Sequence, residues 1–237
     1  GLSCKNIQLS YYTFVSCWTD SEEESIPLWK MYAGKEMHGI RISLDSDMFL
    51  KYHIPSGRFY GVDVYSKNEK SSILPIEKIV TKDYLVVPSF NDSEMFFKKV
   101  LYVDNPFSEM RDVVQIQDMG NGEGAMKMNL KKIGLYKRKC WAFQKEHRFT
   151  LTILPNIWGD IDINQMPKRI MQAVYDRIPP KLSFFDLEIN PELLSKMKIT
   201  LSPICSEAEK VIVESIVQKF APKAIIRESM LKGLINR

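Results

Sequence analysis

The sequence predicts an α+β fold: a single domain over residues 1–237, with a central, mostly antiparallel, curved sheet flanked by helices. Strand-like and helix-like segments both occur, and they follow one another without the regular alternation of a doubly wound sheet. No internal repeat, low-complexity linker or change of composition marks a domain boundary. A chain of 237 residues is long enough to build one large core.

The first half of the chain begins with a strand at 11–18, where aromatic and β-branched residues indicate burial. A helix follows, because Ser25 is a favourable N-cap and the missing N–H of Pro27 costs nothing in a first turn. Trp29 and Tyr32 stand three positions apart and share a face of this helix. Further elements are expected in this half, namely strands at 39–44, 58–65 and 96–103 and a short helix at 45–53.

The second half opens with three glycines within 120–124, which we interpret as a loop because no nucleotide-binding fingerprint surrounds them. Ser206 and Glu209 form a predicted capping box for a helix further on. The inner face of that helix is expected to consist of Ile212, Ile216 and Phe220. The remaining expected elements are helices at 125–139 and 166–178 and strands at 148–154, 182–189, 196–201 and 224–227.

The composition argues against several classes of protein. Apolar residues make up 45% of the chain and charged residues 26%, which is typical of globular proteins rather than disordered ones. No stretch approaches the roughly 18 apolar residues that span a bilayer, so no membrane partner is expected. The four cysteines form no C-x-x-C pair and the three histidines share no ligand spacing. We therefore expect no metal site, no disulfide framework and a cytoplasmic location.

Residues 127–148 form a basic stretch with eight lysine and arginine side chains against one carboxylate, Glu146. Two interpretations stay open. A lysine-rich helix face is commonly no more than a solvated surface. With Trp141 and Phe143 interleaved, the same stretch has the composition of a nucleic-acid or phosphate binding surface.

Several segments of the sequence carry a family resemblance. The tryptophan and tyrosine of the first helix lead to a glycine-containing strand, and a later segment has the form W-x-x-E/Q-x-E-x-R. Together they resemble the bacterial domain of unknown function 2971, a resemblance that implies no activity by itself. Members usually carry a further front segment, so we expect the front of the family domain to be missing here. The resembling segments are 14–19, 28–33, 38–40, 141–148 and 227–231.

The order of these segments also resembles that of the ADP-ribosyltransferase fold, which implies NAD as a possible cofactor. In that fold a catalytic Glu opens a late strand and stabilises the oxocarbenium-like centre formed when nicotinamide leaves. The resemblance gives this role to Glu146, and it gives Gln144 the task of orienting the accepting nucleophile. The residues that it implies for the nucleotide pocket are Ser16, Trp18, Thr19, Trp29, Tyr32 and Arg148.

Each of these residues also has a structural interpretation. Glu146 and Arg148 alternate on one face of a strand and can form an ion pair, while Trp29 and Tyr32 can belong to the core. Such transferases grip the dinucleotide with an early Arg or His, and Lys5 is the one basic residue before the first strand. A third hypothesis is a non-catalytic interaction domain of a bacterial defence or stress system.

Overall fold

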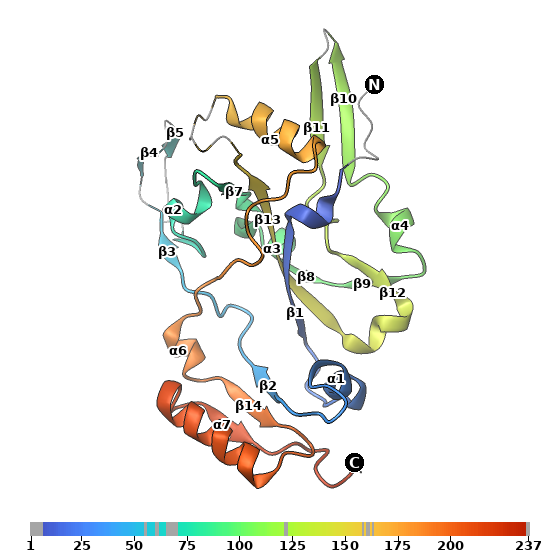
Figure 1. The fold of residues 1–237 in the computed structure, drawn as a ribbon, viewed down its shortest axis with the longest axis vertical. Coiled ribbons are helices and arrows are strands. Elements are labelled where there is room, and N and C mark those ends of the chain that lie inside the picture. The colour runs from blue at the N-terminus through green and yellow to red at the C-terminus, as the bar shows by residue number, and fades with distance from the viewer. Residues whose placement is uncertain are drawn as a thin grey trace. The chain divides into compact units, whose positions relative to one another are not determined.

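The structure is a computed structural model that describes residues 7–54, 56–59, 62–64, 71–120, 123–157, 159, 162 and 164–235. The chain forms two compact units, the first from residues 1–20 and 51–186 and the second from residues 21–50 and 187–237. Helices and antiparallel strand pairs occur in both units, which confirms the α+β class (Figure 1). The expectation of a single domain over residues 1–237 stays a prediction.

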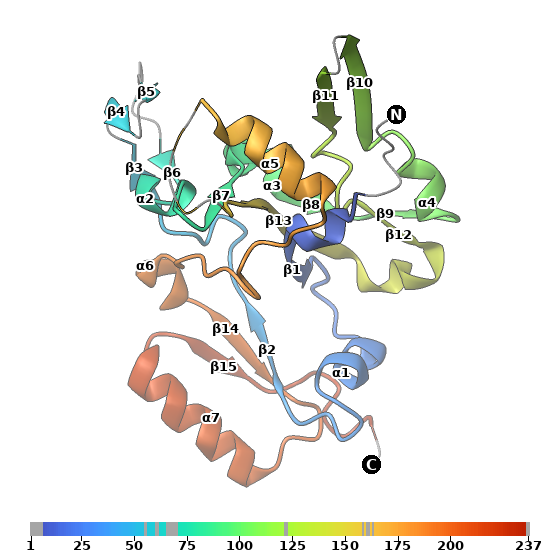
Figure 2. The ribbon, with the colours of Figure 1, turned by 45° about the horizontal axis from the view of Figure 1, so that its top comes forward.

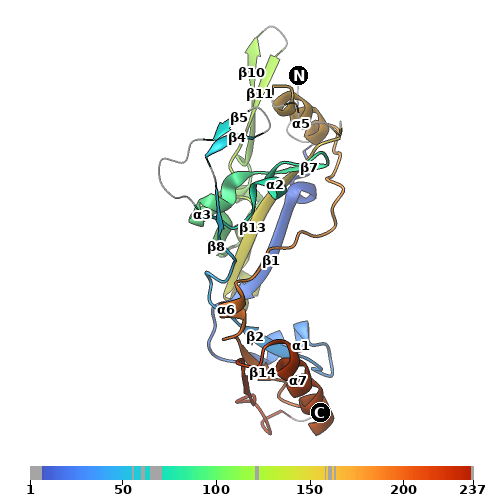
Figure 3. The same cartoon turned by 90° about the vertical axis from the view of Figure 1, so that its left-hand side faces the viewer.

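The central strand of the first unit is β13 (Glu146–Pro155), which is buried over most of its length. On one side it pairs with β1 (Thr13–Thr19), antiparallel and without a break in register (Figure 3). On the other side β8 (Phe97–Lys99) pairs with the start of β13 and β7 (Tyr84–Val86) with its end. The strands expected at 11–18 and 148–154 are confirmed, and the structure shows that they are neighbours in one antiparallel sheet.

Helix α5 (Met166–Tyr175) packs against β13 and confirms the helix expected at 166–178 (Figure 2). Its apolar residues recur at a spacing of four and line one face of the helix. They join a buried cluster that consists of Tyr12, Leu154, Met166, Ile170 and Val174. This cluster forms the core over one end of the sheet.

The rest of the first unit is built from short elements around this sheet. The helical ones are η2 (Leu9–Tyr12), α2 (Ile76–Ile79), η3 (Pro88–Asn91), α3 (Ser93–Phe96), α4 (Pro106–Glu109) and η4 (Lys139–Gln144). Two antiparallel pairs are β3 (Tyr52–His53) with β6 (Ser71–Ser72) and β4 (Gly57–Phe59) with β5 (Val62–Val64). A third is β10 (Val114–Gly120) with β11 (Glu123–Met128), and β12 (Tyr136–Arg138) runs parallel to β9 (Leu101–Val103).

The second unit contains a three-stranded sheet in the order β15 (Ile225–Arg227), β14 (Lys198–Leu201), β2 (Ile40–Ser43). Helix α7 (Glu207–Phe220) connects the parallel strands β14 and β15, and α6 (Pro191–Leu194) precedes them. Strands expected at 39–44, 196–201 and 224–227 are confirmed. Helix α1 (Ile26–Tyr32) begins after Ser25, as expected, and is followed by Gly34 at a φ of 78°, which suits glycine.

The helix expected at 125–139 is wrong. Residues 123–128 pair with 114–120 as a hairpin, and after a turn the chain continues into β12 and η4. Met126 and Met128 are half-buried and Lys127 is exposed, so the local period is two rather than 3.6. Gly134, at a φ of 73°, breaks the segment again. In the expected loop at 120–124, Gly120 ends β10 and 123–124 begin β11, while 121–122 lie outside the described residues.

Four further expectations need correction. No helix forms at 45–53, where the Asp45 carboxylate accepts the backbone N–H of Asp47 and stabilises a turn instead. The segment 182–189 forms no strand beyond a single bridge at Ile189. The single strand expected at 96–103 is instead two short strands, β8 and β9. The single strand expected at 58–65 is likewise divided into β4 and β5. Residues 60, 61 and 65 of the latter segment lie outside the described residues.

Helix α7 has its expected capping box, since Ser206 Oγ accepts the Glu209 N–H and the Glu209 side chain accepts the Ser206 N–H. The expected inner face is wrong, because Ile212, Ile216 and Phe220 are all exposed. The buried row lies one residue further along, at Val217 and Ala221. Smaller side chains therefore line the buried face of this helix.

Candidate functional site

The start of β13 carries a buried carboxylate held by two cations. Lys145, at a φ of 44°, ends η4 and turns the chain so that Glu146 enters the sheet. Only 4% of Glu146 is exposed. Its Oε1 accepts Arg148 Nε at 2.7 Å and its Oε2 accepts Lys137 Nζ at 2.8 Å. The ion pair considered from the sequence is therefore present, with a second cation added.

Hydrogen bonds keep this carboxylate charged. Burial alone raises the pKa of Glu146, but bonds from Arg148, Lys137 and Cys17 outweigh it and lower the pKa to about 2. Lys137 also donates to Oε1 of buried Gln144. Glu146 and Gln144, the expected catalytic pair, are thus brought together through one lysine.

The register of β1 against β13 separates the remaining residues expected in the first unit. Thr19 lies opposite Glu146 and Cys17 lies opposite Arg148. Because side chains alternate along a strand, Ser16 and Trp18 project from the opposite face of the sheet. Their contacts agree with this, since Trp18 Nε1 donates to Ser16 Oγ at 2.9 Å and its ring packs edge-on against Phe149.

Trp29 and Tyr32, the other two residues expected in the pocket, belong to the second unit. Trp29 is buried and its Nε1 donates to Glu24 at 2.9 Å, so it is part of the core of that unit. Tyr32 is 69% exposed and does not share the buried environment of Trp29. The helix therefore does not present these two rings to one environment.

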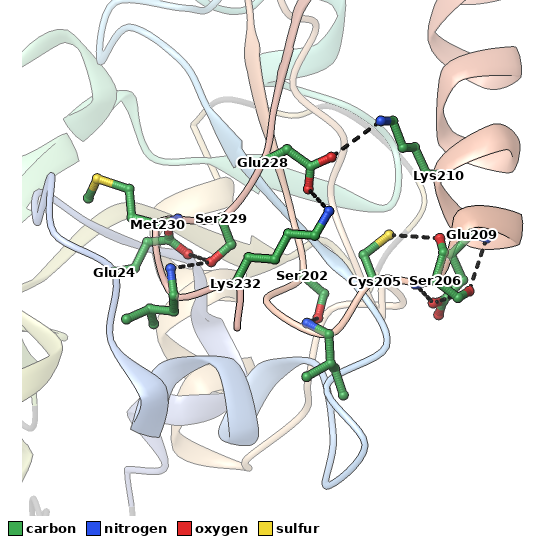
Figure 4. Close-up of polar contacts among 12 residues, drawn as sticks. Glu24, Ser202, Cys205, Ser206, Glu209, Lys210, Glu228, Ser229, Met230 and Lys232 are labelled. Atoms are coloured by element: carbon green, nitrogen blue, oxygen red, sulfur yellow. Dashed lines mark hydrogen bonds and ion pairs between the residues drawn. The ribbon is translucent and has the colours of Figure 1, made fainter. Parts of the chain in front are cut away.

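The second unit contains a polar network around the end of the chain (Figure 4). Glu24 accepts the Ser229 hydroxyl and the Met230 backbone N–H, both at 2.7 Å. Glu228, which points away from Glu24 in this view, pairs with Lys210 and Lys232. The first of these groups fastens the segment after β15 to the segment before α1.

Sequence reasoning missed Lys98, a buried cation on β8. Its Nζ donates to the carbonyl oxygens of Leu130 and Ile133, both at 2.7 Å, and thereby holds the turn that precedes β12. Burial, with a smaller contribution from nearby Arg148, lowers the pKa of Lys98 to about 8. The local signal is a pair of lysines, Lys98 and Lys99, between apolar residues of a strand-like segment, and it does not reveal the partner carbonyls.

The most distinctive exposed feature is the η4 surface, which we define as Lys137, Arg138, Lys139, Trp141, Phe143 and Lys145. Trp141 is 38% exposed and Phe143 42% exposed, and their ring centroids lie 6.1 Å apart. Lys137 Nζ lies 5.2 Å from the Trp141 ring centroid, a cation–π contact. Arg138, Lys139 and Lys145, which lie next to the two aromatic residues in the chain, are exposed.

Comparison with known proteins gave no match, whether to a family model, a curated protein or a solved structure. Within the described residues, no helix has the length and apolar character needed to cross a membrane. The same residues contain no cluster of three or more histidine, cysteine or acidic side chains arranged to hold a metal ion.

Proposed function

We propose that this protein binds nucleic acid, by its phosphates, through the η4 surface. The observation that carries the proposal is the exposed pair of aromatic rings, with Lys137 over one of them and exposed cations on both sides in the chain. In the stretch 127–148 the single carboxylate, Glu146, is buried and neutralised by Arg148 and Lys137. The exposed part of this stretch is therefore strongly positive, as binding to a phosphate backbone requires.

The acidic neighbours of the η4 surface leave it open to an anion. Asp104 pairs with Lys139 at 2.7 Å, but both side chains are well exposed. Such a surface pair contributes little, so Lys139 can exchange it for a phosphate. The Asp20 carboxylate lies 3.9 Å from Lys99 Nζ, which offsets its charge, and 3.8 Å from His147 Nδ1.

The test is fluorescence anisotropy with a labelled oligonucleotide, titrated over a range of salt concentrations. Substituting Arg138, Lys139 and Lys145 together by Ala removes three phosphate contacts, so the log–log salt slope is expected to fall by about 2 for a single strand. The matched control removes three exposed lysines elsewhere, Lys35, Lys181 and Lys223, and loses the same charge. A flat salt response, or equal weakening by both triple variants, rejects the proposal.

An NAD-using transferase centred on Glu146 is the second candidate. In its favour, this carboxylate stays ionised in a buried position, with Gln144 beside it and Thr19 opposite. Both of its oxygens accept hydrogen bonds from cations, which limits their access to a ribose hydroxyl. We therefore favour nucleic-acid binding over the transferase activity. If the wild type releases nicotinamide from NAD and Glu146→Gln does not, the transferase becomes the favoured function.

We also propose that the chain is related to the family of domain of unknown function 2971, which its segments resemble. Two of the resembling segments pair along β1 and β13, and Glu24 connects the Trp29 segment to the ending at Ser229. Segments that resemble one family thus support each other in the fold. We also propose a cytoplasmic location, in keeping with the free thiols of Cys17, Cys140 and Cys205.

A further inference from the structure

We infer that the ligand of the η4 surface is an unpaired nucleic-acid strand, one base of which stacks on Trp141. This inference rests on the proposed function and narrows it, because phosphate binding alone distinguishes neither a single strand from a duplex nor nucleic acid from free phosphate. It is argued from the surroundings of Trp141, from the spacing of the two rings and from the arrangement of the cations.

The ring of Trp141 contacts Lys137, a cation whose own position is fixed by hydrogen bonds. Lys137, which lies over its ring, is bound to Glu146 at 2.8 Å and to Gln144, and both of these side chains are buried. Lys137 is therefore not free to follow a phosphate. Its charge repels a second cation from the same indole, so the open part of the ring favours the neutral π-face of a base over a quaternary ammonium group.

The spacing of the rings excludes insertion of a base between them. Their planes are tilted by 36° and their centroids lie 6.1 Å apart. A base sandwiched between two rings needs both ring planes parallel to its own, with a stacking distance on each side. Trp141 and Phe143 instead present two adjacent exposed rings, a platform on which bases can stack without inserting between them.

A platform of this kind requires bases whose faces are exposed. In a duplex the base faces are covered by stacking, whereas in a single strand they are free to stack on aromatic side chains. Arg138 and Lys139 precede Trp141 in the chain and Lys145 follows Phe143. Cations therefore flank the platform along the chain, as a strand needs if its phosphates are to be bound while its bases stack.

The experiment compares four probes by anisotropy or competition: a short oligothymidylate, an abasic strand of equal length, a blunt duplex and inorganic phosphate. We expect the oligothymidylate to bind most tightly. Trp141→Ala should weaken it by about tenfold to a hundredfold without changing its salt slope, because stacking is lost and phosphate contacts are kept. Trp141→Phe should restore part of the affinity, and binding of the abasic strand should not change.

The control is Phe184→Ala, which removes an exposed ring of the same unit outside the η4 surface. Far-ultraviolet circular dichroism checks that each variant is folded. Equal affinity for the abasic strand or the duplex, or no effect of Trp141→Ala, overturns the stacking inference. If the triple cation variant still weakens binding in that case, nucleic-acid binding by the η4 surface is supported without base stacking. If none of the probes binds, both the proposed function and the stacking inference are rejected.

Discussion

The hydroxyl of Ser229 donates a hydrogen bond of 2.7 Å to the carboxylate of Glu24, across 205 positions of sequence. The same carboxylate accepts Trp29 Nε1 and the backbone N–H of Met230. One acidic side chain thus gathers donors from helix α1 and from the segment that follows β15. Without it, the buried Trp29 and Ser229 donors would have to find other acceptors.

Substituting Glu24 by Ala should therefore loosen the end of the chain. The lost bonds to a charged acceptor, together with unsatisfied buried donors, should cost about 2 to 4 kcal/mol within the second unit. Hydrogen exchange of the Met230 amide reports the change directly, since Glu24 is its acceptor. The control is Glu228→Ala, which removes only exposed ion pairs and should cost less than about 1 kcal/mol. Equal protection of Met230 in both variants contradicts the prediction.

Removing the charge of Glu146 should be among the most damaging conservative changes in the first unit. In Glu146→Gln, Arg148 and Lys137 keep their charges in partly buried positions without the carboxylate. Breaking a buried pair in this way costs about 3 to 5 kcal/mol. Urea unfolding at neutral pH measures the loss. Glu94→Gln, which removes an exposed pair with Lys131, is the control and should change stability by under about 1 kcal/mol.

The same carboxylate should also make stability fall in acid. Its pKa is about 2 in the folded protein, against an ordinary value of 4.5. A carboxyl group with a depressed pKa stabilises the fold above its ordinary pKa, and this contribution is lost as the pH falls from 4.5 toward 2. The loss should amount to about 3 kcal/mol relative to Glu146→Gln. Parallel pH profiles of the two proteins would refute it.

Local signals in the sequence were enough for the capped and strongly periodic elements. Ser206 with Glu209 opens α7, and the spacing of four from Ile170 to Val174 marks α5, because these signals depend on neighbouring residues. The hairpin of β10 and β11 depends instead on a partner strand. A basic segment next to three glycines does not reveal that partner, and for this reason 125–139 was expected to be helical.

The candidate site shows the same limit more sharply. Ser16 and Glu146 were expected to face one pocket, but a sheet assigns faces by register, and one step along a strand reverses the face. The sequence of either strand alone does not predict the register between two strands that are 130 positions apart. The η4 surface is more accessible to sequence reasoning, because its cations and rings are close in the chain, although the expected helix at 125–139 includes residues 136–138, which form β12.

Lys98 should be replaceable by an apolar side chain only at a cost. Lys98→Met leaves the Leu130 and Ile133 carbonyls without their donor, which should cost about 1 to 3 kcal/mol near neutral pH. The neighbour Lys99 is exposed, so Lys99→Met is the matched control and should be nearly neutral. Urea unfolding of the two variants checks this. Equal losses of unfolding free energy in the two variants would show that the hydrogen bonds of Lys98 do not stabilise the fold.

Lys98 should also make stability rise with pH in the alkaline range. Its pKa is lowered to about 8 in the folded protein from an ordinary 10.5, so between these values the unfolded chain binds more protons. Stability of the wild type relative to Lys98→Met should therefore increase by about 3 kcal/mol from pH 8 to pH 10.5. A constant difference across this range contradicts the prediction.

Adjacent residues on α7 offer a direct test of which face of that helix is buried. Val217 is buried and Ile216 is 54% exposed, although the sequence pattern favoured Ile216 for the inner face. Val217→Ala should cost about 1 to 3 kcal/mol, because it deletes buried methyl groups and leaves a cavity. Ile216→Ala should be neutral or slightly stabilising, since alanine has the higher helix propensity and little buried area is lost. Thermal unfolding of the two single variants compares them under identical conditions. A larger loss for Ile216→Ala would mean that the helix is rotated by about 100° from its place in this structure.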